Sequence, residues 1–494
     1  MSTMFRSLGV RNYRIWFIGA LVSNVGAWMQ ATAQNWVVLT ELSDNDAVAV
    51  GVTMALQFGP QLLLVPLSGA VADRFDRRRV LFVTQSLLML LALGLGLMLV
   101  FGHAELWHLY AFALGLGIVN AFDTPARQAF VSDLVSADQL SNAVALNSAS
   151  FNSARLLGPA VAGLLIAAIG SGWVFVINSV SFIAMLLALA LIRVRHRGAV
   201  AVSGGSQASQ LVAGFRYVRR RHDLVVIMIM VFVIGAFGMN FPIYSSTMAV
   251  EFGRGAGEYG VLSSILAIGS LAGALMVARR PAARFRAVVT AAGGFGVSGT
   301  IAALMPTFWT FAISLVLLGY CTSTLLSTAN GFVQTTSEPG MRGRVLSIYF
   351  AILMGGTPVG APVVGAVADA LGARWSLWTA ALAGVVAFGV GLGWLIVGRR
   401  LRVHVHLGAA GHRRPRLTVT HAGRRHDDED PAEQLETLTA PLSVLRRNPV
   451  ILSEPSSAPQ SGALSEGLTG PIGSIGAPGD DPEREEPGDR RGMP

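Results

Sequence analysis

Long apolar runs separated by short polar loops constrain this chain more than any other feature of its sequence. A helix needs about 20 apolar residues to cross the roughly 30 Å hydrocarbon core of a bilayer. Twelve segments of the 494-residue chain meet that need, at 13–39, 48–72, 79–101, 107–131, 142–168, 173–193, 224–249, 259–279, 286–305, 308–333, 345–369 and 375–397. Only 13% of the residues are charged, about half the share of a soluble protein. The sequence therefore predicts an all-α, polytopic membrane protein with 12 transmembrane helices.

The polar residues gather at the carboxyl end of the chain. Residues 401–494 hold half of the 28 acidic residues and are rich in proline, glycine and serine. Such a composition buries too little apolar surface to fold, so we expect a disordered tail. The single cysteine, Cys321, excludes intrachain disulfides, and we expect no metal site.

Arginine placement predicts the orientation of the chain in the membrane. All 37 basic residues are arginine, and they gather in alternate loops, at Arg74–Arg79, Arg193–Arg221, Arg279–Arg286 and Arg342–Arg344. The opposite loops carry only Arg254 and Arg374. Because cytoplasmic loops carry the excess of positive charge, we expect both termini to be cytoplasmic. We expect the protein itself to lie in the inner membrane of a bacterium. In this setting a net charge of +9 indicates topology rather than nucleic-acid binding.

An internal repeat divides the chain. Residues 130–173 align without a gap on residues 332–375, pairing Gly158 with Gly360, Gly163 with Gly365 and Gly170 with Gly372. We therefore predict an N-terminal six-helix bundle at 1–194, a linker at 195–223, a second bundle at 224–400 and the tail at 401–494. The linker has Leu211, Phe215 and Val218 at helical spacing beside arginines, which indicates an amphipathic helix on an anionic membrane surface.

One loop carries a recognisable motif. Between the second and third spans lie Gly69, Asp73, Arg74, Arg77 and Arg78, in the order Gly-Ala-Val-Ala-Asp-Arg-Phe-Asp-Arg-Arg. This resembles the G-x-x-x-D-R-x-x-R-R loop of the major facilitator superfamily, with Asp76 where that family usually has glycine. The resemblance implies a major facilitator fold that works by alternating access.

The resemblance also implies roles for the loop. Asp73 would contact the segment that opens near Arg344–Ser347, and Arg77 would reach Asp133 or Asp123. Such contacts would latch an outward-facing state. The alternative is a basic loop that only sets topology.

Other segments resemble one branch of that superfamily, which contains enterobactin exporters and macrolide-efflux-like permeases. They include Ser23–Gln30, Asp123–Ala129, Arg155–Gly163 and Thr357–Gly360. Gly158 and Pro159 with Gly163 also partly resemble the G-P-x-x-G-G signature of exporters, and small residues of this kind let helices approach closely. The branch favours export over uptake.

Three ionisable side chains lie inside predicted spans, where each is costly and thus a functional candidate. Asp123 and Arg127 are four residues apart and share a helix face, and Arg155 lies midway along the fifth span. Asp123 is a candidate for the proton-exchanging carboxylate, with Arg155 or Arg127 as the charge that modulates its pKa. The alternative is a structural salt bridge.

Polar and aromatic residues on two spans are candidates for the wall of a substrate cavity. They are Asn24, Trp28, Gln30 and Gln34 on the first span, and Asn240 and Tyr244 on the seventh. Interhelical hydrogen bonds would explain the same residues.

The sequence favours a secondary transporter over other classes of membrane protein. A chain without lysine has no P-loop, and we find no nucleophile motif that would make it an enzyme. We expect a monomer in the lipid bilayer that exports amphipathic drugs or toxins, without a cofactor and driven by an ion gradient of protons. Siderophore or secondary-metabolite export is the alternative within the class, and a non-transporting sensor or scaffold is the alternative outside it.

Overall fold

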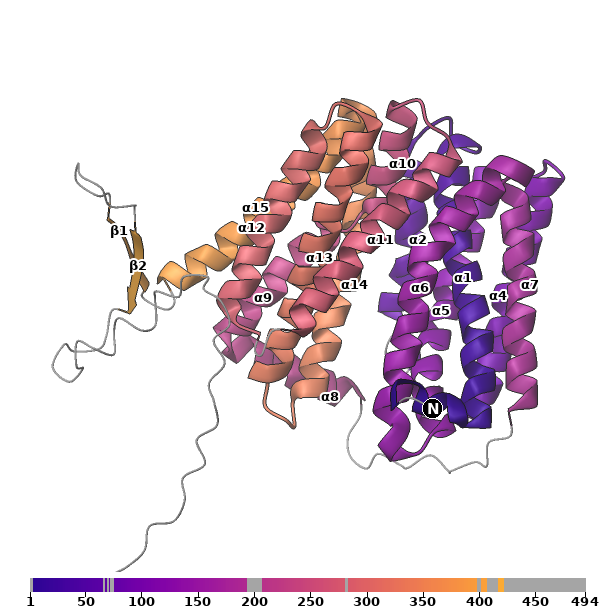
Figure 1. The fold of residues 1–494 in the computed structure, drawn as a ribbon, viewed down its shortest axis with the longest axis horizontal. Helices are drawn as coiled ribbons and strands as arrows, with labels where there is room; N and C mark the ends of the chain where they lie inside the picture. The colour runs from indigo at the N-terminus through magenta and orange to yellow at the C-terminus, as the bar shows by residue number, and fades with distance from the viewer. Residues whose placement is uncertain are drawn as a thin grey trace, which may run out of the picture. The chain divides into compact units, whose positions relative to one another are not determined.

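The computed structural model describes residues 3–64, 67–68, 71, 75–192, 207–279, 283–397, 401–406 and 416–421. The described chain is helical apart from its last two segments (Figure 1). After the 3₁₀ turn η1 (Thr3–Gly9), the first half consists of α1 (Arg11–Thr40), α2 (Ala47–Leu63), α4 (Arg77–Val100), α5 (Leu106–Leu134), α6 (Ala137–Ile169) and α7 (Ser171–Leu191).

The second half follows a linker helix, α8 (Gln207–Arg220). It consists of α9 (His222–Val233), the π-helical turn η2 (Ile234–Gly238), α10 (Phe241–Glu251), α11 (Ala256–Ala278), α12 (Phe285–Leu304), α13 (Phe308–Thr336), α14 (Arg342–Leu371) and α15 (Ala373–Val397).

Ten helices in the described residues are long and apolar enough to cross a membrane. The one at His222–Glu251 contains α9, η2 and α10. The helices α1 and α2 occupy the first two predicted spans but are not among the ten, because α1 carries several amide side chains and α2 has 17 described residues. The all-α prediction is confirmed for the spans, whereas their number of twelve stays a prediction.

Two glycines of the internal repeat share their backbone geometry. Gly170 and Gly372 end α6 and α14 with φ of 89° and 102°, values that favour glycine. In both cases the next helix begins at once, at Ser171 and Ala373. Two segments that are 202 residues apart therefore make the same tight corner between helices.

The halves pack most extensively through two helix pairs, α2 with α14 and α6 with α11. Each depends on a glycine of the repeat. A Cβ on Gly163 would lie 2.8 Å from the carbonyl oxygen of Ala256, at the start of α11. A Cβ on Gly365 would meet the carbonyl of Ala47, at the start of α2. The missing side chains let the two backbones approach closely.

A carboxylate strengthens one of these pairs. The two oxygens of Asp369, near the end of α14, accept hydrogen bonds from the backbone N–H groups of Ala47 and Val48, both at 2.8 Å. The first N–H groups of a helix have no partner within it and carry partial positive charge. Asp46 accepts from Ala49 N in the same turn, at 3.1 Å. Asp369 thus completes the cap of a helix that belongs to the other half.

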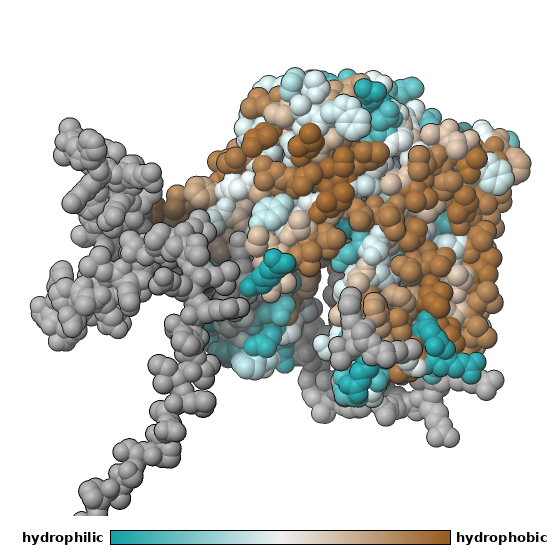
Figure 2. Space-filling view, viewed as in Figure 1, coloured by the Kyte–Doolittle hydropathy of each residue, from teal (hydrophilic) through white to brown (hydrophobic). Residues whose placement is uncertain are grey.

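These contacts lie at one end of the bundle, which we call the arginine-poor end. The loops at this end are residues 41–46, 101–105, 252–255, 305–307 and 372. The opposite, arginine-rich end carries η1, residues 75–79 and α8. The surface is hollowed between the halves toward the arginine-rich end (Figure 2). The space between the halves therefore opens at the end that carries the amino terminus (Figure 1).

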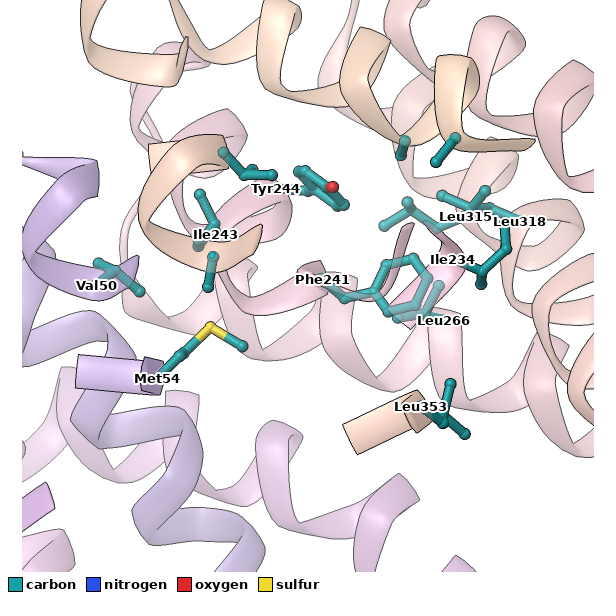
Figure 3. Packing of buried hydrophobic residues seen from close by; sticks show 14 of the residues in the cluster. Val50, Met54, Ile234, Phe241, Ile243, Tyr244, Leu266, Leu315, Leu318 and Leu353 are labelled. Atoms are coloured by element: carbon teal, nitrogen blue, oxygen red, sulfur yellow. The ribbon is translucent and has the colours of Figure 1, made fainter. Parts of the chain in front are cut away.

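Apolar side chains seal the closed end. Val50 and Met54 of α2 lie beside Ile243 of α10, while Phe241 and Tyr244 extend into the second half (Figure 3). All five side chains are buried. Large apolar groups from both halves thus fill the space where the glycine contacts bring the backbones together.

The helix expected in the linker is present as α8, and it packs on the second half. A Cβ on Gly214 would lie 3.0 Å from the side chain of Ile348 on α14. The Tyr217 hydroxyl accepts a hydrogen bond from Glu338 N at 3.3 Å, whereas Phe215 is 57% exposed. Residues 195–206 of the predicted linker lie outside the described residues.

The segment that composition predicts to be disordered contains a short hairpin. Strands β1 (Leu401–His406) and β2 (Arg416–His421) pair antiparallel, with Val403 opposite Val419. Both strands are rich in β-branched residues, which favour this pairing locally, a signal that the composition of the whole tail does not register. Residues 422–494 lie outside the described part.

We predict that Asp369→Asn loosens the arginine-poor end. The amide cannot accept both hydrogen bonds, and a lost cap of this kind costs about 1 kcal/mol, equivalent to about a fivefold shift in an equilibrium. In a Cys321→Ser background, a Val50→Cys reporter should react faster with a membrane-impermeant maleimide when Asp369→Asn is added. Asp44→Asn, in the loop that precedes α2, is the control. Equal reaction rates of the reporter with Asp369→Asn and with Asp44→Asn would contradict the role of Asp369.

Candidate functional site

Two arginines of the loop motif hold the arginine-rich end of the first half together. Arg77 Nη1 lies 2.9 Å from Asp133 Oδ1. Of the two partners that the resemblance implies, Asp133 and Asp123, Arg77 therefore contacts Asp133. Arg78 donates from Nε to the carbonyl of Leu189 at 2.7 Å and from Nη2 to that of Ala190 at 3.1 Å. It thereby satisfies the last carbonyls of α7.

The other motif residues, Gly69, Asp73 and Arg74, lie outside the described residues. The contact between Asp73 and the start of α14 therefore stays a prediction. Asp76 has a function that the motif does not indicate: its Oδ1 accepts from Arg78 N at 2.8 Å and from Arg79 N at 3.4 Å. It is the N-cap of α4, and an aspartate directly before an apolar periodic run is the signal that could have identified it.

Asp123 lies at the centre of a buried polar network on α5. Its Oδ2 accepts from Arg127 Nε at 3.1 Å, across one helical turn that stays regular past Pro125. Its Oδ1 accepts from Thr84 Oγ1 and Gln85 Nε2 of α4, both at 2.7 Å. The carboxylate thus has three donors, and the predicted pairing of Asp123 with Arg127 is confirmed. Thr84 and Gln85 were not among the predicted residues.

The network continues from α5 to the first helix. Arg127 Nη1 donates to Asn24 Oδ1 at 3.4 Å, and Asn24 Nδ2 donates to Ser150 Oγ of α6, also at 3.4 Å. The Arg127 side chain is 20% exposed and that of Asp123 only 5%. The arginine thus links a buried carboxylate to the polar surface between α1 and α6.

Arg155 is separate from this network. Its guanidinium lies over the Trp28 ring, 5.9 Å from the centroid, and Trp28 meets Phe151 edge-on at 5.6 Å. Within the described residues it has no ion pair and no hydrogen-bond partner. Of the two arginines proposed to act on Asp123, the structure places only Arg127 beside it.

Two other candidates on α1 form hydrogen bonds between helices inside the first half. Gln30 Oε1 accepts from Asn178 Nδ2 of α7 at 2.6 Å, and Gln34 Nε2 donates to Gln57 Oε1 of α2 at 2.9 Å. Both glutamines are buried. For these two residues the structure favours interhelical bonding over the wall of a cavity.

The two candidates in the second half are also buried. Asn240 Nδ2 donates to the carbonyl of Ala236 at 2.6 Å, and its Oδ1 has no partner among the described residues. The Tyr244 hydroxyl donates to the carbonyl of Phe237 and lies 3.4 Å from Thr379 Oγ1. Both residues therefore stabilise the break between η2 and α10, which Gly238 and Pro242 favour in the sequence.

The exporter-like residues of α6 face two different partners. A Cβ on Gly158 would lie 2.5 Å from Trp28 Cβ, so this glycine permits the close contact with α1. The carbonyl of Pro159 instead lies against Gly260 of α11, in the other half. Sequence reasoning did not identify Asp369, whose contact with α2 spans the two halves. In the described part of the chain, no three His, Cys, Asp or Glu residues gather as a metal site.

Comparison with known proteins gives a consistent picture. A family model described as a transmembrane secretion effector matches residues 2–397. The staphyloferrin A transporter of Staphylococcus aureus is 32% identical over 36% of this chain and 45% of its own length. The multidrug efflux pump Tap of Mycolicibacterium fortuitum is 27% identical over 72% and 88%. The enterobactin exporter EntS of Salmonella typhimurium is 23% identical over 72% and 84%.

Solved transporter structures share the fold. A bacterial homologue of the human lysosomal transporter Spinster superposes with a TM-score of 0.61 at 15% identity, over 78% of this chain and 98% of that one.

We predict that Asp123 and Arg127 are strongly coupled in stability. Removing one partner of a buried pair leaves an uncompensated charge, at a cost of about 3 kcal/mol or more. Asp123→Asn and Arg127→Gln should each lower the thermal unfolding temperature of the purified protein, and the double variant should lose less than their sum. The pair of Arg77 and Asp133, about a third exposed, is the matched control, with coupling of about 1 kcal/mol or less. Additive effects at Asp123 and Arg127 would refute the coupling.

Proposed function

Because the chain belongs to the transmembrane secretion effector family of the major facilitator superfamily, we propose that it exports amphipathic small molecules by alternating access. The observation that carries this proposal is the pair of repeat-related glycine contacts, Gly163 with α11 and Gly365 with α2. Both lie at the arginine-poor end, and the space between the halves opens at the other. A rocking motion about these two contacts would expose that space to each side in turn.

The direction of transport follows from orientation and relatives. The excess of arginine supports a cytoplasmic position for the arginine-rich end, and with it for both termini, in a bacterial cell. The described conformation would then load substrate from the cytoplasm. Relatives named as an efflux pump and as an exporter support outward transport, as does the partial match of Gly158, Pro159 and Gly163 to the exporter signature.

Two substrate classes fit this site. Drug or toxin efflux is supported by the multidrug pump, which matches 88% of its own length. Siderophore export is supported by the staphyloferrin A and enterobactin relatives. The aromatic pair of Trp28 and Phe151 suits a molecule with a planar apolar part in either class.

We assign coupling to a proton gradient, with Asp123 as the exchanging group. Among the described residues it is the only charged side chain that is buried. Exchange would require the carboxylate to leave Arg127, which is the partly exposed member of the pair. The alternative is that this network only anchors α5 to α4. No covalent chemistry is involved, since the family consists of transporters.

Proton flux in liposomes tests the transport and the coupling together. With the purified protein reconstituted around a trapped pH-sensitive dye, addition of tetracycline should release protons, and Asp123→Asn should reduce that release to background. Asp138→Asn, which alters an exposed pair with Arg6, should leave it unchanged. Normal exchange by Asp123→Asn would remove Asp123 from the coupling. Absence of any gradient-dependent transport in the wild-type protein would favour the sensor or scaffold class.

Orientation has its own test. Alkaline phosphatase fused after residue 400 should be inactive in cells, and a green fluorescent protein fused there should fluoresce, because the first folds only outside the cytoplasm. A phosphatase fused after Phe252, in an arginine-poor loop, should be active. The reverse pattern would invert the proposed direction.

A further inference from the structure

Arg155 is a permanent cation in the middle of a membrane helix, and the described part of the chain supplies no anion for it. A charge at this depth is costly unless it has a partner or faces water. Other arginines follow the rule: Arg127 pairs with Asp123, Arg77 with Asp133 and Arg374 with Glu251. Within the described residues Arg155 has no such partner, and its guanidinium lies over the face of Trp28. Its five N–H donors are thus available to another molecule.

The position of Arg155 on α6 places it beside the space between the halves. At 100° per residue it lies on the same face as Pro159 and Gly163, which pack on α11. It comes one turn before Pro159, toward the arginine-rich end. The same face continues there with Ser148 and Asn152, both exposed.

The opposite face of α6 differs in kind. Leu157 and Leu164 are 53% and 69% exposed, as expected for side chains in contact with lipid. The Arg155 face exposes Ser148 and Asn152 together with Val144 and Phe151, as expected for the wall of an amphipathic cavity. The opposite face exposes leucines, and this contrast assigns Arg155 to the open space rather than to the bilayer.

We propose that Arg155 and Trp28 form a subsite for a substrate that carries a carboxylate or similar oxyanion on a planar ring. A guanidinium binds an oxyanion through two parallel hydrogen bonds, and the indole offers a face for the ring. Phe151 supports the indole edge-on at 5.6 Å. The inference rests on the proposed function, because it names the class of molecule that the exporter would carry.

Charge also separates this class from the alternatives. A cationic amine would be repelled by Arg155, and the nearest buried carboxylate, Asp123, already accepts from Arg127, Thr84 and Gln85. A role in proton exchange is equally disfavoured, since Arg155 does not contact Asp123. The subsite thus favours anionic substrates among the amphipathic molecules considered above.

Two dyes with the same three-ring skeleton test the assignment. Fluorescein is anionic and rhodamine 123 is cationic, and anisotropy reports the binding of each to the purified full-length protein. The wild-type protein should bind fluorescein about tenfold more tightly or better, as expected for a charge-assisted bidentate contact. Arg155→Gln should remove that preference, Arg155→Lys should retain part of it, and Trp28→Leu should weaken the binding of both dyes.

Controls separate this effect from loss of net charge and from misfolding. Arg286→Gln, which removes an exposed arginine at the start of α12, should leave both affinities unchanged. Each variant should elute as the wild-type protein does on size exclusion, and Arg155→Lys keeps the test valid should Arg155→Gln not fold.

The outcomes distinguish this inference from the proposed function. Fluorescein binding that is weak in the wild-type protein, or that is unchanged in Arg155→Gln, overturns the subsite even where drug-dependent proton flux is intact. Binding of fluorescein through Arg155 in a protein that supports no flux overturns the proposed function and leaves the subsite in place.

Discussion

Close backbone contact between helices of different halves is the constraint on which the rest of this structure depends. Inside a bilayer the hydrophobic effect does not drive helices together, so packing and buried polar contacts must do so. Gly163 and Gly365 provide that packing at α11 and α2. Asp369 adds two hydrogen bonds to the first turn of α2. The repeat position that corresponds to Asp369 is Ala167, so the two contacts between the halves share their glycines but not their polar cap.

Arginines within the described helices differ in what they contact. Arg78 satisfies the last carbonyls of α7, and Arg127 balances a buried carboxylate. Each of these contacts is local to one half, so neither would have to break in the proposed rocking of the halves. Arg155 lies where the halves part, with its donors free among the described residues. Conformational change and substrate recognition would thus involve different side chains of the same helix, α6.

Several functions of individual residues could be predicted from the sequence because they depend on nearest neighbours along the chain. The pair of Asp123 and Arg127 follows from helical spacing. The corners at Gly170 and Gly372 follow from the repeat. Asp76 could also have been identified by its position before α4. Gln30, Gln34, Asn240 and Tyr244 could not be assigned, because an amide or hydroxyl in a span serves equally well as a cavity wall or as a bond to the next helix.

The sequence by itself determined the apolar spans, the duplication, the family and the arginine asymmetry between the two ends, because each of these depends only on the composition and order of residues along the chain. Only the tertiary structure decided which polar groups meet across helices. It separated Arg155 from Asp123, buried the predicted cavity residues of α10, and brought Asp369 to the first turn of α2, 321 residues away. Such contacts depend on how each helix is rotated and how deep it lies. Those quantities are set by packing against neighbours, which no single segment of sequence contains.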